Sequence, residues 1–193
     1  MSRTHMSLGL LVWVMLLGCA APTPPSRLSQ YVRPVALAES ASRELPASRP
    51  VRAVLVVVAA KSAQDAAPAL PEEAQERLAH TLGERINQGF PIVIEHVVNL
   101  GEALIGTTPP NWIEVAKQQS VDYVLVVVLS NTEQEYPVSL FLGWTTHRQP
   151  GFRRDNWSLA EAALVDGRTG GQLLHAEGRA MATLDSPTAP GIS

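Results

Sequence analysis

The chain has 193 residues, a formal net charge of −3 and a single cysteine. A mildly acidic chain without basic clusters argues against nucleic acid or anionic lipid headgroups as partners, and a lone cysteine cannot form an internal disulfide. The length between its two low-complexity ends predicts one domain with a substantial core.

Residues 1–18 predict a signal peptide. Arg3 is the only arginine or lysine among them, and the run Leu8–Leu17 is apolar apart from Gly9. Ten residues are too few to span the hydrocarbon core of a bilayer, which needs roughly 20, but they suit the apolar region of a secretory signal. The alternative is a buried core helix. That helix would have to begin at a polar, basic hexapeptide and end in a proline cluster.

The stretch Leu16-Leu17-Gly18-Cys19 resembles the lipobox of bacterial lipoproteins. The resemblance implies cleavage between Gly18 and Cys19 and acylation of the Cys19 thiol by palmitate-like chains. Each buried methylene contributes about 0.8 kcal/mol, and two or three chains make such an anchor effectively permanent. Ala20 and Ala21 follow the cysteine directly, with no aspartate there. By resemblance to lipoprotein sorting, this favours the outer membrane, on the side that faces the periplasm.

Residues 19–50 predict the lipidated N-terminus and a proline-rich tether, because this stretch carries six prolines among many serines, alanines and arginines. A flexible coil of this length spans roughly 30 Å. The apolar residues Leu28, Tyr31, Val32 and Val35 break the pattern. We expect them to dock either onto the domain or onto a partner. Residues 186–193 predict a disordered tail.

The domain, residues 51–185, begins with a valine-rich run at 51–60 that predicts a strand buried on both faces. A helix follows at 71–88, with an apolar stripe made of Ala74, Leu78, Leu82 and Ile86. Residues 91–100 predict a second strand, and 111–119 a short helix with capping-box spacing at its start. Further strands are predicted in the second half of the domain, at 121–131, 138–146, 157–165 and 172–184.

The order of these elements is β-α-β-α-β-β-β. Crossovers through helices predict parallel pairing in the first half, and the last strands predict a meander that closes on the glycine-rich turn 166–171. The fold class is therefore α/β (α+β), with a single mixed sheet of about six strands. The simplest assembly places the two helices mainly on one face of this sheet.

Several stretches together resemble small envelope lipoproteins of bacteria. They are Ser26–Tyr31, the strand Val121–Val127, the segment around Trp144 and the hairpin Leu164–Leu174. The layout resembles the rhombotarget lipoprotein group, and the α/β domain is similar to the N-terminal domain of the Tol-Pal periplasmic protein. Curli-channel lipoproteins and activators of cell-wall synthases look alike at this level. The resemblance implies an envelope lipoprotein, and its shared aspartates, Asp122 and Asp166, are interpreted as turn residues.

No stretch predicts catalysis, a metal site or a cofactor. The four histidines after residue 19 have no ligand spacing, and the turn 166–171 joins two predicted strands instead of opening a phosphate-binding helix. Nothing in the sequence brings Ser158, Asp166 and His175 together as a triad. His80 is interpreted as a surface residue. We therefore expect the protein not to be an enzyme and to need neither metal nor cofactor.

Aromatic residues gather between positions 136 and 157, in a stretch broken by prolines and glycines. They are Tyr136, Phe141, Trp144, Phe152 and Trp157. Aromatic side chains dominate binding hot spots, so one interpretation is an interaction surface. The other is that these residues plug the open end of the core. The loop 101–111 is a second candidate contact.

Three functions are compatible with these features. The first is a membrane-tethered, non-catalytic accessory or protein-interaction module of the bacterial cell envelope, with an envelope protein as its partner. The second is a subunit of an envelope secretion or export assembly. The sequence shows no long amphipathic β-hairpin, which such a subunit needs to cross a membrane. The third is an envelope hydrolase.

Overall fold

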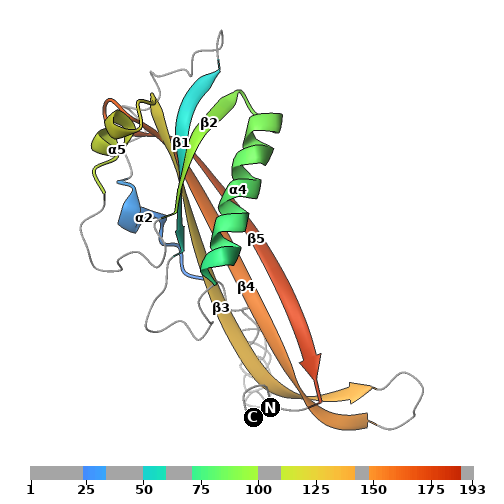
Figure 1. Ribbon diagram of the computed structural model, residues 1–193. Coiled ribbons are helices and arrows are strands. Elements are labelled where there is room, and N and C mark those ends of the chain that lie inside the picture. The colour runs from blue at the N-terminus through green and yellow to red at the C-terminus, as the bar shows by residue number, and fades with distance from the viewer. Residues whose placement is uncertain (1–23, 34–49, 60–70, 100–109, 142–147, 188–193) are drawn as a thin grey trace, which may run out of the picture.

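A computed structural model describes residues 24–33, 50–59, 71–99, 110–141 and 148–187. Its centre is one five-stranded sheet with the strand order β2-β1-β3-β4-β5, flanked by helices (Figure 1). The elements are α2 (Leu28–Tyr31), β1 (Val51–Ala59), α4 (Glu72–Gly89), β2 (Ile92–Asn99), α5 (Trp112–Gln118), β3 (Tyr123–Phe141), β4 (Arg148–Asp166) and β5 (Gln172–Ser186). This confirms the predicted mixed α/β class with a single sheet.

The pairing of the strands agrees with the prediction. Strand β1 pairs in parallel with both β2 and β3, and β3, β4 and β5 form an antiparallel meander. The count of about six was wrong by one, because the strands expected at 121–131 and 138–146 are one continuous strand, β3. Pro137 lies inside it. Strand β1 ends at Ala59, opposite Leu129, and no other described strand pairs with that edge of β3 beyond this point. A residue without an N–H is tolerated there.

The helices lie on opposite faces of the sheet, and the expectation that both lie mainly on one face was wrong (Figure 1). The strand order explains this. The chain moves from β1 outward to β2 through α4, and then back past β1 to β3 through α5. Parallel crossovers are right-handed. Two right-handed crossovers that run in opposite directions across a sheet place their helices on opposite faces.

The valine run of β1 supplies both cores, because successive side chains of a strand point to opposite faces. Val54, Val56 and Val58 face α2 and α5. Ala53, Leu55 and Val57 face α4. All six are at most 1% exposed. A strand buried on both faces has no polar positions to alternate with, which is why the run is continuous.

Helix α4 packs on the sheet through a stripe that differs from the predicted one. Its buried residues are Gln75, Ala79, Gly83 and Ile86, whereas Leu78 is 40% exposed. A Cβ atom on Gly83 would already lie 3.4 Å from Val97 Cγ2. Small residues therefore let the helix approach the sheet closely, and the large leucine at 78 is left outside this contact.

The meander extends well beyond the part of the sheet that the helices cover. Past the end of β1, residues 131–141, 148–158 and 180–186 continue as a three-stranded ribbon, which curves away from the helices in Figure 1. We call these residues the arm, and the remainder of the described chain the body. No strand was predicted between residues 146 and 157, but residues 148–156 belong to strand β4.

Candidate functional site

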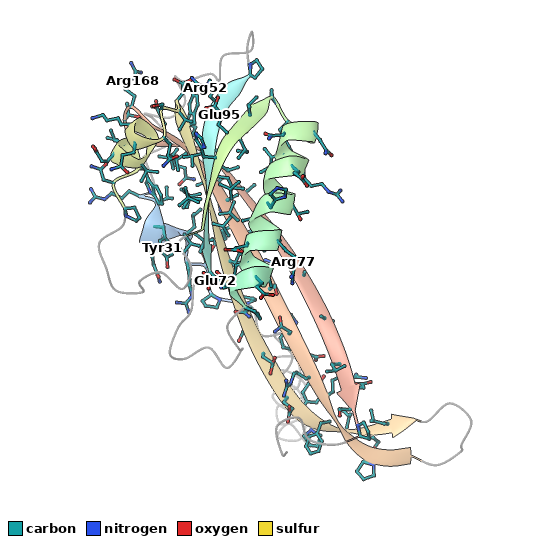
Figure 2. All side chains as sticks on the ribbon, viewed as in Figure 1. Tyr31, Arg52, Glu72, Arg77, Glu95 and Arg168 are labelled. Atoms are coloured by element: carbon teal, nitrogen blue, oxygen red, sulfur yellow. The ribbon has the colours of Figure 1, made fainter. Side chains whose placement is uncertain are left out.

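A segment of the predicted tether packs on the body. Leu28, Tyr31 and Val32 are at most 6% exposed and join the core cluster on the α5 side of the sheet. Figure 2 places Tyr31 on the side of the sheet opposite α4. Of the two expectations for this segment, the structure supports docking on the domain for these three residues, whereas Val35 lies outside the described residues. We call residues 24–33 the docked segment.

A buried carboxylate on β4 holds the start of the docked segment. Glu161 is 2% exposed. Its Oε1 accepts a hydrogen bond of 2.6 Å from Ser26 Oγ, and its Oε2 accepts bonds of 2.7 Å and 3.2 Å from the backbone N–H groups of Arg27 and Leu28. Hydrogen bonds to charged groups contribute about 1.5–3 kcal/mol each. A carboxylate buried without such partners would be strongly unfavourable. Docking therefore gives hydrogen-bond partners both to Glu161 and to the backbone N–H groups of the segment.

Trp112 fastens the other end of the docked segment. This residue of α5 is 5% exposed, and its Nε1–H donates a 2.8 Å hydrogen bond to the backbone carbonyl of Tyr31. Burial raises the pKa of the Tyr31 hydroxyl. Asn111, expected to cap α5, makes no side-chain capping bond. The sequence could not predict this bond, because the partner of Trp112 lies 81 positions away in the chain.

The arm is held together by polar contacts across its strands. Asp155, 8% exposed, accepts 2.7 Å hydrogen bonds from the Tyr136 hydroxyl at Oδ2 and from the Thr183 hydroxyl at Oδ1. These hydrogen bonds, the Tyr136 bond first, hold the pKa of Asp155 below its usual value, and the same bond raises the pKa of Tyr136. One carboxylate thus joins all three strands.

Ion pairs line both faces of the arm. Arg153 makes a two-point contact with Asp185, at 2.7 Å and 2.9 Å, and this contact lowers the pKa of the Asp185 carboxyl. On the opposite face Arg154 lies 3.1 Å from Glu133 and 2.9 Å from Glu135. The register assigns these residues to alternate faces. The arm therefore presents charged residues on both sides.

The aromatic residues singled out in the sequence belong to this arm, but they do not share one face. Tyr136 and Trp157 lie on the face that carries the docked segment, and Phe152, paired with Pro137, lies on the other. All three are half-buried. Phe141 pairs with Arg148 in the ladder, and Trp144 lies outside the described residues, as do Gly18, Cys19 and most of the loop 101–111.

The described residues hold no group of three or more His, Cys, Asp or Glu side chains that could bind a metal ion. Ser158 and His175 lie on opposite faces of the sheet, five ladder positions apart. Asp166 acts as the predicted turn residue, because its Oδ1 accepts a 2.8 Å bond from the backbone N–H of Arg168. Gly170 takes a φ of 70° in the same turn. His80 is exposed, as expected.

No helix within the described residues has the length and apolar character needed to cross a membrane. No protein-family model matches the chain, and no curated protein matches it.

The chain is similar to several solved structures. These include lipoprotein GNA1162 from Neisseria meningitidis (15% identity, TM-score 0.36, covering 74% of this chain and 88% of that one). They also include the PelC dodecamer from Paraburkholderia phytofirmans (14%, 0.38, 69% and 72%) and the LpoB C-terminal domain from Salmonella enterica (15%, 0.38, 69% and 86%). All three TM-scores are below 0.5, so these similarities assign no function to this chain.

Proposed function

We propose that this protein is a lipid-anchored, non-catalytic accessory module of the bacterial cell envelope that binds an envelope protein. It is attached through acylated Cys19 after removal of residues 1–18, and it stands on the periplasmic side of the outer membrane. The resemblance to rhombotarget lipoproteins, on the residues quoted above, supports the same assignment.

The observation that carries this proposal is the position of the docked segment relative to the cysteine. Pro24, its first residue, follows Cys19 by five positions. Five extended residues span at most about 18 Å. An acyl group on Cys19 would therefore hold the body directly beside the bilayer, instead of at the end of a tether of about 30 residues. The hydrogen bonds of Glu161 and Trp112 then hold the docked segment, and with it the anchor, against the body.

The arm supplies the surface for a protein partner. It projects from the body, and it combines half-buried aromatic side chains with ion pairs on both faces. Protein interfaces are enriched in aromatic residues and arginine. The proposed contact comprises Tyr136, Phe141, Trp144, Phe152 and Trp157.

The anchor is tested by replacing Cys19 with serine in the full chain. Cells expressing each form are labelled with palmitate and fractionated. We expect the unaltered chain to incorporate label and to sediment with envelopes, and Cys19→Ser to lose both properties. Label-free chain that still sediments with envelopes would overturn the anchoring.

The contact surface is tested by photo-crosslinking in whole cells with the single variants Trp157→Ala, Phe152→Ala and Trp144→Ala. Phe90→Ala is the matched control, because Phe90 is an aromatic residue of the body that is 64% exposed. We expect the arm variants, and not Phe90→Ala, to reduce the yield of one crosslinked envelope protein. An unchanged yield in all three arm variants would overturn the surface.

A second candidate is a subunit of an envelope secretion or export assembly. The observation that favours it is the β3–β4 hairpin, with 19 residues in each strand, because such a subunit needs a long hairpin and the sequence alone had shown none. Its charged residues on both faces do not give the alternation of apolar and polar residues that a membrane-crossing hairpin needs. A ring of many copies in detergent would favour this candidate over the first.

A further inference from the structure

Among the strands that the structure describes, β5 forms a long open edge of the sheet. It contains 15 residues, it stands last in the strand order, and all residues from Leu174 to Asp185 are exposed. Open edges are usually protected by very short length, by charged side chains (lysine above all), by proline or by bulges. From Gln172 to Ser186, β5 contains neither proline nor lysine, and its one irregularity lies at its start, opposite Leu164 and Val165.

The other edge of the sheet is protected in these ways. Strand β2 has eight residues, and its pairing with β1 is interrupted by a register shift between Ala53 and Val54. Glu95 of β2 is engaged by Arg52 of β1, with Arg52 Nε 2.5 Å from Glu95 Oε1, as Figure 2 shows at one end of the sheet. The β2 and β5 edges therefore differ, and of these two β5 is the longer and more regular strand.

Two residues of opposite charge flank Gly178 in β5. Glu177 precedes this glycine and Arg179 follows it, and both side chains lie on the face that carries the docked segment, 3.4 Å from each other. A Cβ atom on Gly178 would meet no heavy atom within 4 Å, so the backbone is open to approach between these two residues.

We propose that two copies of this chain pair antiparallel through β5, with Gly178 on the two-fold axis. Glu177 of each copy then lies opposite Arg179 of the other, which forms two cross-strand ion pairs. On the other face Ala176 lies opposite Ala180, and Leu174 lies opposite Ala182. Each of these pairs contains at least one alanine, so no two large side chains oppose each other there. The two five-stranded sheets become one continuous sheet of ten strands.

The charges select this register. Directly opposed residues of an antiparallel pair have side chains on the same face. A two-fold axis normal to the sheet must therefore lie midway between the two copies of one residue. An axis at Glu177 sets two glutamates against each other, and an axis at Arg179 sets two arginines against each other. Like charges in directly opposed positions are destabilising, whereas opposite charges contribute favourably. Of these three centres, only Gly178 gives two attractive pairs. An axis at Ala182 would also oppose Arg179 and Asp185, but Asp185 is already held by Arg153.

The same geometry suits two anchored chains. A two-fold axis normal to the sheet keeps the same face of both copies on the same side. Both docked segments therefore lie on one face of the joint sheet, and both N-termini can reach one bilayer. This last step rests on the proposed lipid anchor, whereas the pairing itself does not.

The test measures the oligomeric state of the full-length mature chain in detergent by native mass spectrometry. We expect a dimer for the unaltered chain. Glu177→Arg and Arg179→Glu each replace the two attractive pairs with two repulsive ones, so each should weaken the dimer by at least about tenfold. Mixing these two variants should restore a dimer made of one copy of each, because the opposite charges then face each other again.

A crosslink tests the register. Directly opposed residues of antiparallel strands have Cα atoms about 4.5–5.5 Å apart, within the range of a disulfide. Gly178→Cys should therefore crosslink on oxidation. Ala182→Cys is the control, because in the same dimer its two copies lie eight residues apart along the strand, roughly 27 Å.

The outcomes separate the dimer from the anchor. Crosslinking of the unaltered chain would report a free Cys19 thiol, which counts against acylation and leaves the β5 dimer standing. A monomeric unaltered chain, a dimer unaffected by either charge reversal, or equal crosslinking of Gly178→Cys and Ala182→Cys would overturn the dimer. Circular dichroism of each variant verifies that it is folded.

Discussion

The body and the arm are parts of the same three strands, yet different interactions hold them. In the body, β3 alternates between two apolar cores, and its residues from Val124 to Val128 are at most 9% exposed. In the arm the same strand carries Glu133, Glu135 and Tyr136, which bond to arginine and aspartate side chains on β4. The strand changes character where β1 and the helices end.

The difference teaches that backbone pairing continues after the hydrophobic core has ended. Burial of apolar side chains contributes roughly 25 cal/mol per Å², while exposed ion pairs contribute at most about 1 kcal/mol each. The body therefore supplies most of the stability. We expect the arm to open at lower free energy than the body, as regions with few buried contacts do.

The largest expected effect comes from a cavity in the body. Leu55 is 0% exposed between α4 and the sheet, so Leu55→Ala should lower the free energy of unfolding by about 2–5 kcal/mol. Leu184→Ala is the matched control in the arm, where the side chain is 60% exposed, and should change it by less than about 0.5 kcal/mol. Urea unfolding measures both. Equal losses would remove the distinction between body and arm.

The next test puts the same substitution in each region. A Cβ atom on Gly167 would lie 2.7 Å from the backbone oxygen of Asp122, and one on Gly151 would lie 2.8 Å from that of Ser186. Because Gly167 lies in the body, Gly167→Ala should destabilise the whole domain by about 1–3 kcal/mol. Gly151→Ala should reduce amide-exchange protection in the arm alone. Loss of protection in the body of Gly151→Ala would show that the two regions unfold together.

A smaller, local effect is expected at the docked segment. Glu161→Gln keeps the size of the side chain but replaces one of the two oxygens that accept these three hydrogen bonds with an NH₂ group. The change should cost about 1–3 kcal/mol. Hydrogen exchange at the amides of Arg27 and Leu28 measures the release. Glu84→Gln, on the exposed side of α4, is the control and should leave both amides protected. Unchanged protection in Glu161→Gln would contradict the docking.

The smallest effect is a dependence of the arm on pH. The pKa values of Asp155 and Asp185 are both lowered in the folded protein, chiefly by hydrogen bonds from Tyr136 and Arg153. Their contribution is therefore complete above the unfolded pKa of about 4 and is lost as the pH falls through the lower folded values. NMR titration of the carboxyl carbons, with amide exchange in the arm, measures this. Asp155→Asn should remove the contribution of Asp155 to this pH dependence.

Periodicity and composition predicted much of the body. The run 51–60, the helix at 71–88 and the turn at 166–171 were placed within one or two residues, because buried strands, helix ends and tight turns depend on local residue types. The length of β3 was missed, since Pro137 normally ends a central strand and only the end of β1 makes that position an open edge.

The candidate site was less accessible to sequence reasoning. The aromatic residues were found by composition, but their division between two faces depends on the register of β3 against β4. Glu161 gave no signal, because a glutamate in a strand is ordinarily solvated. Its role follows from contacts with residues more than 130 positions earlier in the chain.

The sequence by itself determined the kinds of elements and the parallel and antiparallel halves of the sheet, because these depend on side-chain periodicity and on the lengths of the connections. Only the tertiary structure decided that the helices cover opposite faces, that the docked segment joins the body and that the meander becomes an arm. Each of these depends on which distant segments meet, and a carboxylate or a proline acquires its role only from the neighbours that the fold brings to it.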